Sequence, residues 1–138
     1  MRIVQDTCVW VSALRSPDAS SAQVVDRCLA GDDTPLMGAA LLAEYEAQIE
    51  RGDLWQGIPV SLAERRQMLA DFLAACQWQR VWYLWRPNLP DEGDNHVLDL
   101  AIAGGALHLV THNVKDFAGE LRFALPRILT PAQHLKLV

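Results

Sequence analysis

The sequence has few of the features that place a chain in a membrane or in an oxidising compartment. Its longest apolar run is far shorter than the ~18 residues that a helix needs to cross a bilayer. We expect no signal peptide, because only two apolar residues separate Arg2 from the polar Gln5 and Asp6. Only 3 cysteines are present, widely spaced and without a CxxC pair. This usage is typical of reduced thiols. We therefore expect a cytoplasmic protein that does not contact a membrane.

The chain also lacks the glycine-rich loops that bind nucleotide phosphates and the serine elbow of hydrolases. An excess of positive charge is missing as well, because the formal net charge is −5 at pH 7. This charge argues against a protein that binds nucleic acid through a basic surface alone. The charge does not exclude a protein that binds nucleic acid through bound metal ions, because each divalent ion adds two positive charges.

What the chain does contain is an ordinary globular composition and an alternating pattern. The 138 residues, of which 51% are apolar and 21% charged, are enough for one domain with its own core, and we expect residues 1–138 to form it. Apolar patterns and caps predict strands at 2–5, 34–37, 77–84, 107–111 and 128–129, and helices at 20–29, 39–51, 61–76, 94–103 and after Thr130-Pro131. This alternation predicts an α/β fold with a parallel sheet between helices.

Four acidic residues stand where such a fold would gather them. Sites form outside the carboxyl ends of parallel strands; Asp6 ends the first predicted strand and Asp116 follows the fourth. Glu44 and Asp94 lie on or near the inward faces of the second and fourth predicted helices. Several ionised carboxylates can crowd together only around a cation, and oxygen ligands favour Mg²⁺ or Mn²⁺. The pattern therefore predicts metal-assisted chemistry on a phosphodiester.

Each of these acids alone has a simpler explanation. Asp6 and Asp94 are acceptable helix or turn caps, Glu44 is common on solvated helix faces, and Asp116 is a turn former. The 4 histidines, His96 among them, are scattered and are more often surface or core residues than ligands. The combination of the four acids, in this order on an alternating fold, is what favours a site.

Four stretches of the chain resemble the PIN-domain ribonucleases, and most of all the branch that forms the toxins of toxin–antitoxin systems. They are IVQDTCVWVSAL, EYE at 44–46, PDEGDNHVLDLAIAGGALHLVTHNVKDF and RILTPAQHL. The resemblance implies a PIN-like three-layer sandwich, with a central parallel sheet flanked by helices. It also implies a ribonuclease that hydrolyses RNA phosphodiester bonds, with Mg²⁺ or Mn²⁺ held by Asp6, Glu44, Asp94 and Asp116.

One turn departs from many members of that family. They read Thr-Gly-Asp after the fourth strand, whereas this chain reads Thr111-His112-Asn113. Similar Asn-x-x-Asp turns occur in the family, so we assign Asp116 to the fourth acid and Asn113 to a neighbouring polar contact. We expect Thr7 and Thr111 to hydrogen-bond the carboxylates or a water on the metal.

The resemblance also implies a mechanism and partners. Water attacks the phosphodiester in line and the 3′ oxygen leaves, while Glu44 holds a second ion or acts as the base, and cations such as Lys115 position the backbone. An antitoxin protein would cover the acidic groove, and a homodimer is expected because family members commonly pair. The tryptophans Trp55, Trp78, Trp82 and Trp85 either form such an interface or fill the core.

Two other kinds of function stay open. A PIN fold with weak or lost catalysis would be a module that binds RNA or a protein partner, and Asn113 and the negative net charge favour it. Calorimetry with Mn²⁺ separates the two, because binding that disappears in Asp94→Asn favours the enzyme. A phosphatase or phospho-acceptor domain also places an Asp after the first strand. The phosphatase would need a second Asp where this chain has Cys8, and the acceptor domain an acid pair before it and a late Lys.

Overall fold

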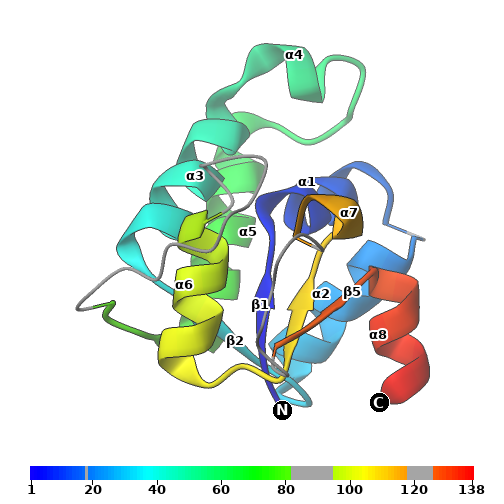
Figure 1. Ribbon diagram of the computed structural model, residues 1–138. Coiled ribbons are helices and arrows are strands. Elements are labelled where there is room, and N and C mark those ends of the chain that lie inside the picture. The colour runs from blue at the N-terminus through cyan, green and yellow to red at the C-terminus, as the bar shows by residue number, and fades with distance from the viewer. Residues whose placement is uncertain (18, 82–94, 118–125) are drawn as a thin grey trace.

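Five parallel strands form the centre of the protein. The computed structural model describes residues 1–17, 19–81, 95–117 and 126–138. Within them the strands lie side by side in the order β3-β2-β1-β4-β5, and every neighbouring pair is parallel (Figure 1). The strands are β1 (Arg2–Gln5), β2 (Thr34–Met37), β3 (Gln77–Trp78), β4 (His108–Val110) and β5 (Arg127–Leu129). The predicted α/β fold is confirmed.

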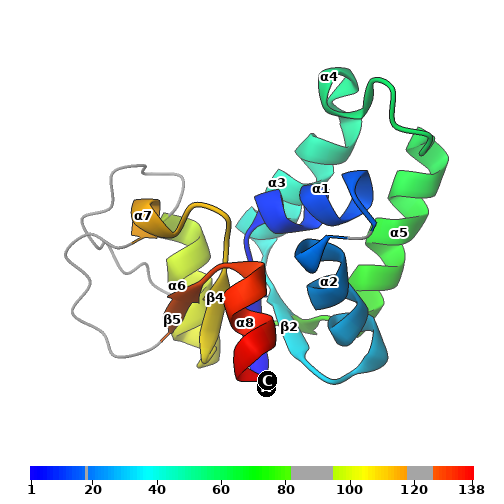
Figure 2. The same cartoon turned by 90° about the vertical axis from the view of Figure 1, so that its right-hand side faces the viewer.

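Helices cover both faces of this sheet. α6 packs on one face, and α2 and α8 lie on the other, which gives three layers (Figure 2). In the described ranges, no helix is both long and apolar enough to pass through a lipid bilayer. The helices are α1 (Thr7–Arg15), α2 (Ser20–Ala30), α3 (Ala39–Glu50), α4 (Gly52–Trp55), α5 (Leu62–Ala75), α6 (Asn95–Gly104), α7 (Val114–Phe117) and α8 (Pro131–Leu137).

The core joins the sheet to the helices that follow its strands. Ile3 and Val4 on β1 have no exposed surface, as expected for a central strand whose two faces are both covered. Trp10 on α1 stacks on Tyr45 of α3, and Tyr45 stacks on Phe72 of α5, with ring centroids 5.4 and 6.0 Å apart. These aromatic pairs contribute beyond their burial, and they hold α3 and α5 against the helix that follows β1.

Several helix ends are capped as predicted. Ser61 begins α5 with a complete capping box, and Thr130 does the same for α8, where Pro131 is the first helical residue. Gly31 ends α2 with a φ of 84°, a left-handed conformation that favours glycine. These caps can be recognised in the sequence because each forms its hydrogen bonds with backbone groups only a few residues away.

Other elements differ in part from the prediction. α2 begins at Ser20 as predicted, but Ala19 before it makes no side-chain cap. The short helix α4, which opens at Gly52, was not predicted. The strand predicted at 77–84 ends at Trp78; residues 79–81 are not in a strand, and 82–84 lie outside the described residues. β3 is thus a short edge strand. Of the tryptophans, Trp55 is buried and Trp78 is 53% exposed, while the other two named above lie outside the described ranges.

The helix α1 was not predicted at all. Its sequence, TCVWVSALR, has consecutive apolar residues Val9, Trp10 and Val11, which hide the helical period, and two of them are β-branched. The structure begins this helix directly after β1, with Asp6 as its N-cap. Asp6, which directly follows the first strand, is therefore also the N-cap of α1.

Candidate active site

Asp6 lies at the carboxyl end of β1, and both oxygens of its carboxylate have partners. Oδ1 accepts a hydrogen bond from the backbone N–H of Thr7, and Oδ2 accepts one from the hydroxyl of Thr111, both at 2.8 Å. The thiol of Cys8 also donates to Oδ2, at 3.5 Å. Asp6 is only 6% exposed. The first turn of α1 and the residue after β4 thus hold this carboxylate in one orientation.

The surroundings of Asp6 disfavour its charge. Burial has the largest effect and raises the pKa of Asp6 above its ordinary 3.8; the hydrogen bond from Thr111 lowers this pKa, and the charge of Glu44 raises it. The smaller bonds from Cys8 and Thr7 lower it, and the net direction is upward. An ionised Asp6 is therefore costly as the protein stands, and a cation beside it would remove that cost.

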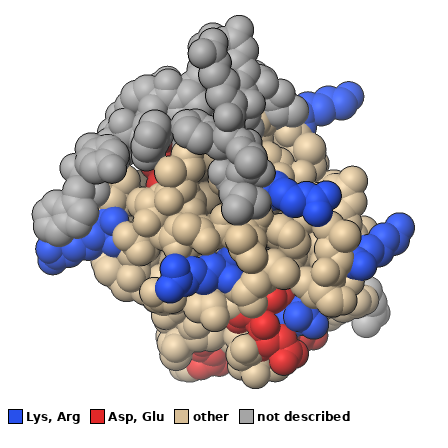
Figure 3. Space-filling model, turned by 60° about the horizontal axis from the view of Figure 1, so that its bottom comes forward, with Lys and Arg blue, Asp and Glu red and all other residues tan. Residues whose placement is uncertain are grey.

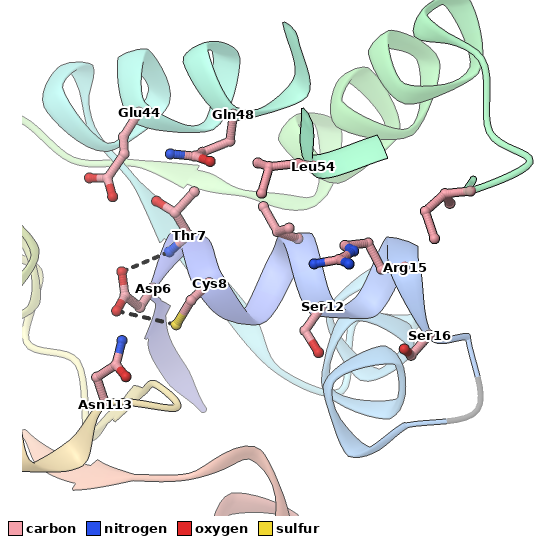
Figure 4. A pocket seen from close by; sticks show the side chains of 12 residues that line it. Asp6, Thr7, Cys8, Ser12, Arg15, Ser16, Glu44, Gln48, Leu54 and Asn113 are labelled. Atoms are coloured by element: carbon pink, nitrogen blue, oxygen red, sulfur yellow. Dashed lines mark hydrogen bonds between the residues drawn. The ribbon is translucent and has the colours of Figure 1, made fainter. Parts of the chain in front are cut away.

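Glu44 lies on α3, and its carboxylate points toward Asp6 (Figure 4). Its side chain is 36% exposed, and Oε2 lies 2.8 Å from Nε2 of His96 on α6. Glu44 therefore connects two helices that follow different strands. Its partial exposure leaves the carboxylate reachable by water or by a substrate.

A buried hydrogen bond fixes α3 relative to β1. The hydroxyl of Tyr45 donates to the carbonyl oxygen of Gln5 at 2.6 Å, and the two residues are 0% and 1% exposed. Tyr45 follows Glu44 and Gln5 precedes Asp6 in the chain. A bond made away from water is costly to leave unpaired, so it holds the two acidic residues near each other.

Asp6 and Glu44 lie at one end of a cavity of about 650 Å³. α1 runs along one side of it, and α3 and α4 form the opposite side (Figure 4). The side chain of Asn113, just past β4, also points toward Asp6 in this view. The lining residues are Asp6, Thr7, Cys8, Val11, Ser12, Arg15, Ser16, Glu44, Gln48, Leu54, Ile58 and Asn113.

The structure places the other predicted site residues differently. Asp116 lies on α7, where its backbone N–H donates to the carbonyl of Asn113 at 3.0 Å, and it is not among the residues that line the cavity. Asp94 precedes α6 and lies outside the described residues. Thr111 contacts Asp6 through its hydroxyl, and Thr7 does so through its backbone. The buried hydroxyl of Thr7 has no partner among the residues that are described.

The donors at this end of the cavity suit a hard cation. The carboxylates of Asp6 and Glu44 offer oxygen, the ligand that Mg²⁺ and Mn²⁺ prefer, whereas the Asn113 amide turns its nitrogen toward Asp6 (Figure 4). Burial, and to a smaller extent the charge of Glu44, raise the pKa of Asp6 at the same place. In the parts of the chain that the structure describes, no three or more His, Cys, Asp or Glu side chains form a group that could hold a metal ion.

Some lining residues had a signal in the sequence that the prediction did not use. Gln48 lies four residues after Glu44, a spacing that puts both on one face of a helix. His96, which contacts Glu44 and does not itself line the cavity, lies two residues after Asp94 in the longest of the four stretches. Ser12 and Arg15 had no such signal, because the helix that carries them was not predicted.

Comparisons with known proteins agree with the observed fold. A family model described as the PIN domain matches residues 2–115. A search of curated proteins found no match. Among solved structures, one similar chain belongs to VapBC2 from Rickettsia felis bound to a DNA fragment from its promoter; the TM-score is 0.60, the identity is 19%, and the match covers 94% of this chain and 97% of that chain. At this identity the likeness concerns the fold. Because the family model spans most of the chain, the protein belongs to the PIN-domain family, whose members are generally nucleases.

Proposed function

We propose that this protein is a metal-dependent ribonuclease that hydrolyses RNA phosphodiester bonds and acts as the toxin of a toxin–antitoxin pair. The observation that carries the proposal is the meeting of the Asp6 and Glu44 carboxylates at one end of a cavity, beside Asn113. Burial raises the pKa of Asp6, and the charge of Glu44 adds to it, so a cation is the natural counterpart of this pair.

The same residues account for where a metal would be held. Asp6 and Glu44, with the predicted ligands Asp94 and Asp116, would hold Mg²⁺ or Mn²⁺. When bound, such an ion polarises the phosphoryl oxygens and lowers the pKa of water for attack on phosphorus. Members of this family generally use divalent ions, which supports this assignment.

The chain's own side chains supply positioning and proton transfer. Hydrogen bonds from Thr111 and from the backbone of Thr7 hold Asp6 in one orientation. Glu44, partly exposed and held by His96, either accepts the proton of the attacking water or holds a second ion. Attack in line with the 3′ oxygen breaks the phosphorus–oxygen bond and leaves a 5′-phosphate and a 3′-hydroxyl. The departing 3′ oxygen takes its proton from solvent water, and the proton of the attacking water returns to solvent.

Cleavage of a labelled RNA in Mg²⁺ or Mn²⁺, and in EDTA, tests this function. We expect Asp6→Asn and Glu44→Gln each to lower the rate about 100-fold or more, as is typical when an essential acid or base is lost. Glu46→Gln is the matched control, because Glu46 is an exposed acid on the same helix, two residues further along. Wild-type rates in Asp6→Asn, or full activity in EDTA, would reject the proposal.

We further propose the partners that accompany this activity. The solved complex with a similar fold is a VapBC2 assembly, and this supports an antitoxin protein that covers the acidic end of the cavity. The proposal includes one PIN domain over residues 1–138, a homodimer, and a cytoplasmic location. A light-scattering mass equal to one chain at micromolar concentration would contradict the dimer.

A second candidate function is a PIN module that binds RNA or a protein without efficient catalysis. One observation favours it: an amide, Asn113, stands beside Asp6 in the cavity. Calorimetric titration with Mn²⁺ decides between the two. Binding that is lost in Asp94→Asn supports the enzyme, and no binding to the wild-type protein supports the module.

A further inference from the structure

The two ends of the cavity differ in charge. Asp6 and Glu44 lie at one end, and Arg15, the last residue of α1, lies at the other. Figure 4 shows the Arg15 guanidinium turned back along α1 toward the space between the helices. Among the described residues that line the cavity, Arg15 is the only Lys or Arg. A negatively charged group at this end would therefore be attracted by Arg15 alone.

Arg15 is also available for a ligand. It is exposed and makes no hydrogen bond or ion pair with any other described residue. Other arginines are engaged: Arg51 pairs with Asp53 at 2.8 Å, and Arg66 pairs with Glu50 at 3.2 Å. A guanidinium without a partner, directed into a cavity, is suited to a phosphate, which it binds with two parallel hydrogen bonds.

The wall between the two ends offers groups that a nucleic-acid strand can contact. Ser12 on α1, Ser16 directly after it and Gln48 on α3 carry hydroxyl and amide groups of the kind that hydrogen-bond phosphates and sugars. Leu54 and Ile58 provide apolar surface on the opposite side. Apolar surface of this kind can pack against the faces of unpaired bases. The lining therefore fits a single strand better than a small anion.

The length of α1 sets how far such a strand extends. Arg15 lies nine positions after Asp6, which corresponds to about 13.5 Å along a helix with a rise of about 1.5 Å per residue. Stacked nucleotides advance about 3.4 Å each, so a strand would cover this distance in about four nucleotides.

The space-filling view of the opposite end of the molecule shows Lys and Arg side chains that stand apart, without a continuous basic surface on this face (Figure 3).

We propose that Arg15 is a phosphate-binding residue for single-stranded RNA, which contacts the backbone about four nucleotides from the bond that is cut. This inference rests on the proposed ribonuclease function for the position of the cut. Arg15 is a positioning residue, because it touches the substrate far from the reacting atoms. It compensates, at the far end of the cavity, for the repulsion between the RNA backbone and the two acids.

A purely structural role for Arg15 makes different predictions. A cation in the last turn of a helix interacts favourably with the helix dipole, so its removal would lower the melting temperature whether or not RNA binds there. A phosphate contact, in contrast, releases counterions and makes the affinity depend on salt. The salt dependence of RNA binding therefore separates the two roles.

The experiment measures binding of a fluorescent eight-nucleotide single-stranded RNA by anisotropy at several salt concentrations. All variants carry Asp6→Asn so that the RNA stays intact. We expect Arg15→Gln to weaken binding about three- to tenfold and to reduce the slope of log K against log salt by about 0.7, the value for one phosphate of a single strand. Arg15→Lys should keep most of the slope. Arg66→Gln, the matched control, removes an equal charge from a residue that does not line the cavity and should leave the slope unchanged.

Two results would overturn the proposal. One is an unchanged slope in Arg15→Gln, with or without a lower melting temperature. The other is an equal loss of slope in Arg66→Gln, which would mean that binding responds to total charge. Failure of the ribonuclease function can be told apart from failure of this proposal. If the wild-type protein binds RNA without cutting it, the ribonuclease function is wrong, but the salt slopes of Arg15→Gln and Arg66→Gln can still be compared.

Discussion

Replacement of Thr111 by valine removes the hydroxyl that bonds Asp6 and keeps the shape of the side chain. Thr111 is fully buried; its Oγ1 donates to Asp6 at 2.8 Å and accepts from the backbone N–H of Asn113 at 3.0 Å. Valine can make neither bond. The substitution therefore isolates what one hydroxyl contributes to the stability and the charge state of the site.

The size of the effect follows from these contacts. A hydrogen bond to a charged group contributes ~1.5–3 kcal/mol to stability, and the bond from Asn113 contributes less because Asn113 is exposed and water can replace its partner. We expect the unfolding free energy to fall by about 2 kcal/mol. With an unfolding entropy of about 2.1 cal/mol/K per residue, a chain of 138 residues would then melt about 7 °C lower.

The same change alters the titration of Asp6. The bond from Thr111 is the largest influence that lowers the pKa of Asp6, against burial, which raises it. In Thr111→Val that pKa should rise further. Because the ionised carboxylate is the form that binds a cation, we expect the acid limb of the pH–rate profile to move to higher pH.

Urea denaturation followed by circular dichroism measures the stability, and RNA cleavage against pH measures the titration. Thr7→Val is the matched control, because the Thr7 hydroxyl is buried without a partner among the described residues. Its loss should change stability by less than ~0.5 kcal/mol or raise it slightly. Equal stability changes in the two variants would refute the account of Asp6 given above.

Two further predictions concern buried titratable groups. Burial would raise the pKa of Asp33, but the hydrogen bonds from Arg27 and His134 outweigh it and hold the pKa below the ordinary 3.8. This carboxylate therefore stabilises the fold above pH ~4 and loses that effect as the pH falls through its lowered pKa, so Asp33→Asn should cost about 2 kcal/mol in urea unfolding at pH 7 and progressively less as the pH falls below ~4. Burial and the charge of Asp6 raise the pKa of the Cys8 thiol to about 11, so iodoacetamide at pH 8 should label Cys8 far more slowly in the folded protein than in urea, as judged by mass spectrometry.

The parallel sheet could be predicted because its signals are local. Buried strands such as Arg2–Gln5 and Thr34–Met37 alternate with helices whose caps lie within a few residues. α1 was not predicted because its apolar residues follow one another and hide the helical period. Its N-cap, Asp6, also directly follows β1, so the prediction took it as the end of that strand. The four-residue helices α4 and α7 are too short to have a period of their own.

The site could be predicted only in outline. Asp6 was predicted to lie at the site by the rule for the ends of parallel strands, and Glu44 by its position near the inward face of a helix. The structure brings both to one cavity. The contact between Glu44 and His96 depends on how α3 meets α6, which no local pattern specifies. The place of Arg15 depends on the direction of a helix that was not predicted. Tertiary packing, not local propensity, decides these contacts.

The hydrogen bond between the Tyr45 hydroxyl and the Gln5 carbonyl limits how the acidic end can rearrange. Each partner is one peptide unit from an acid, so a movement of α3 away from β1 would break a bond that water cannot reach. An inhibitor that moves α3 away from β1 would then inactivate the protein without occupying the cavity.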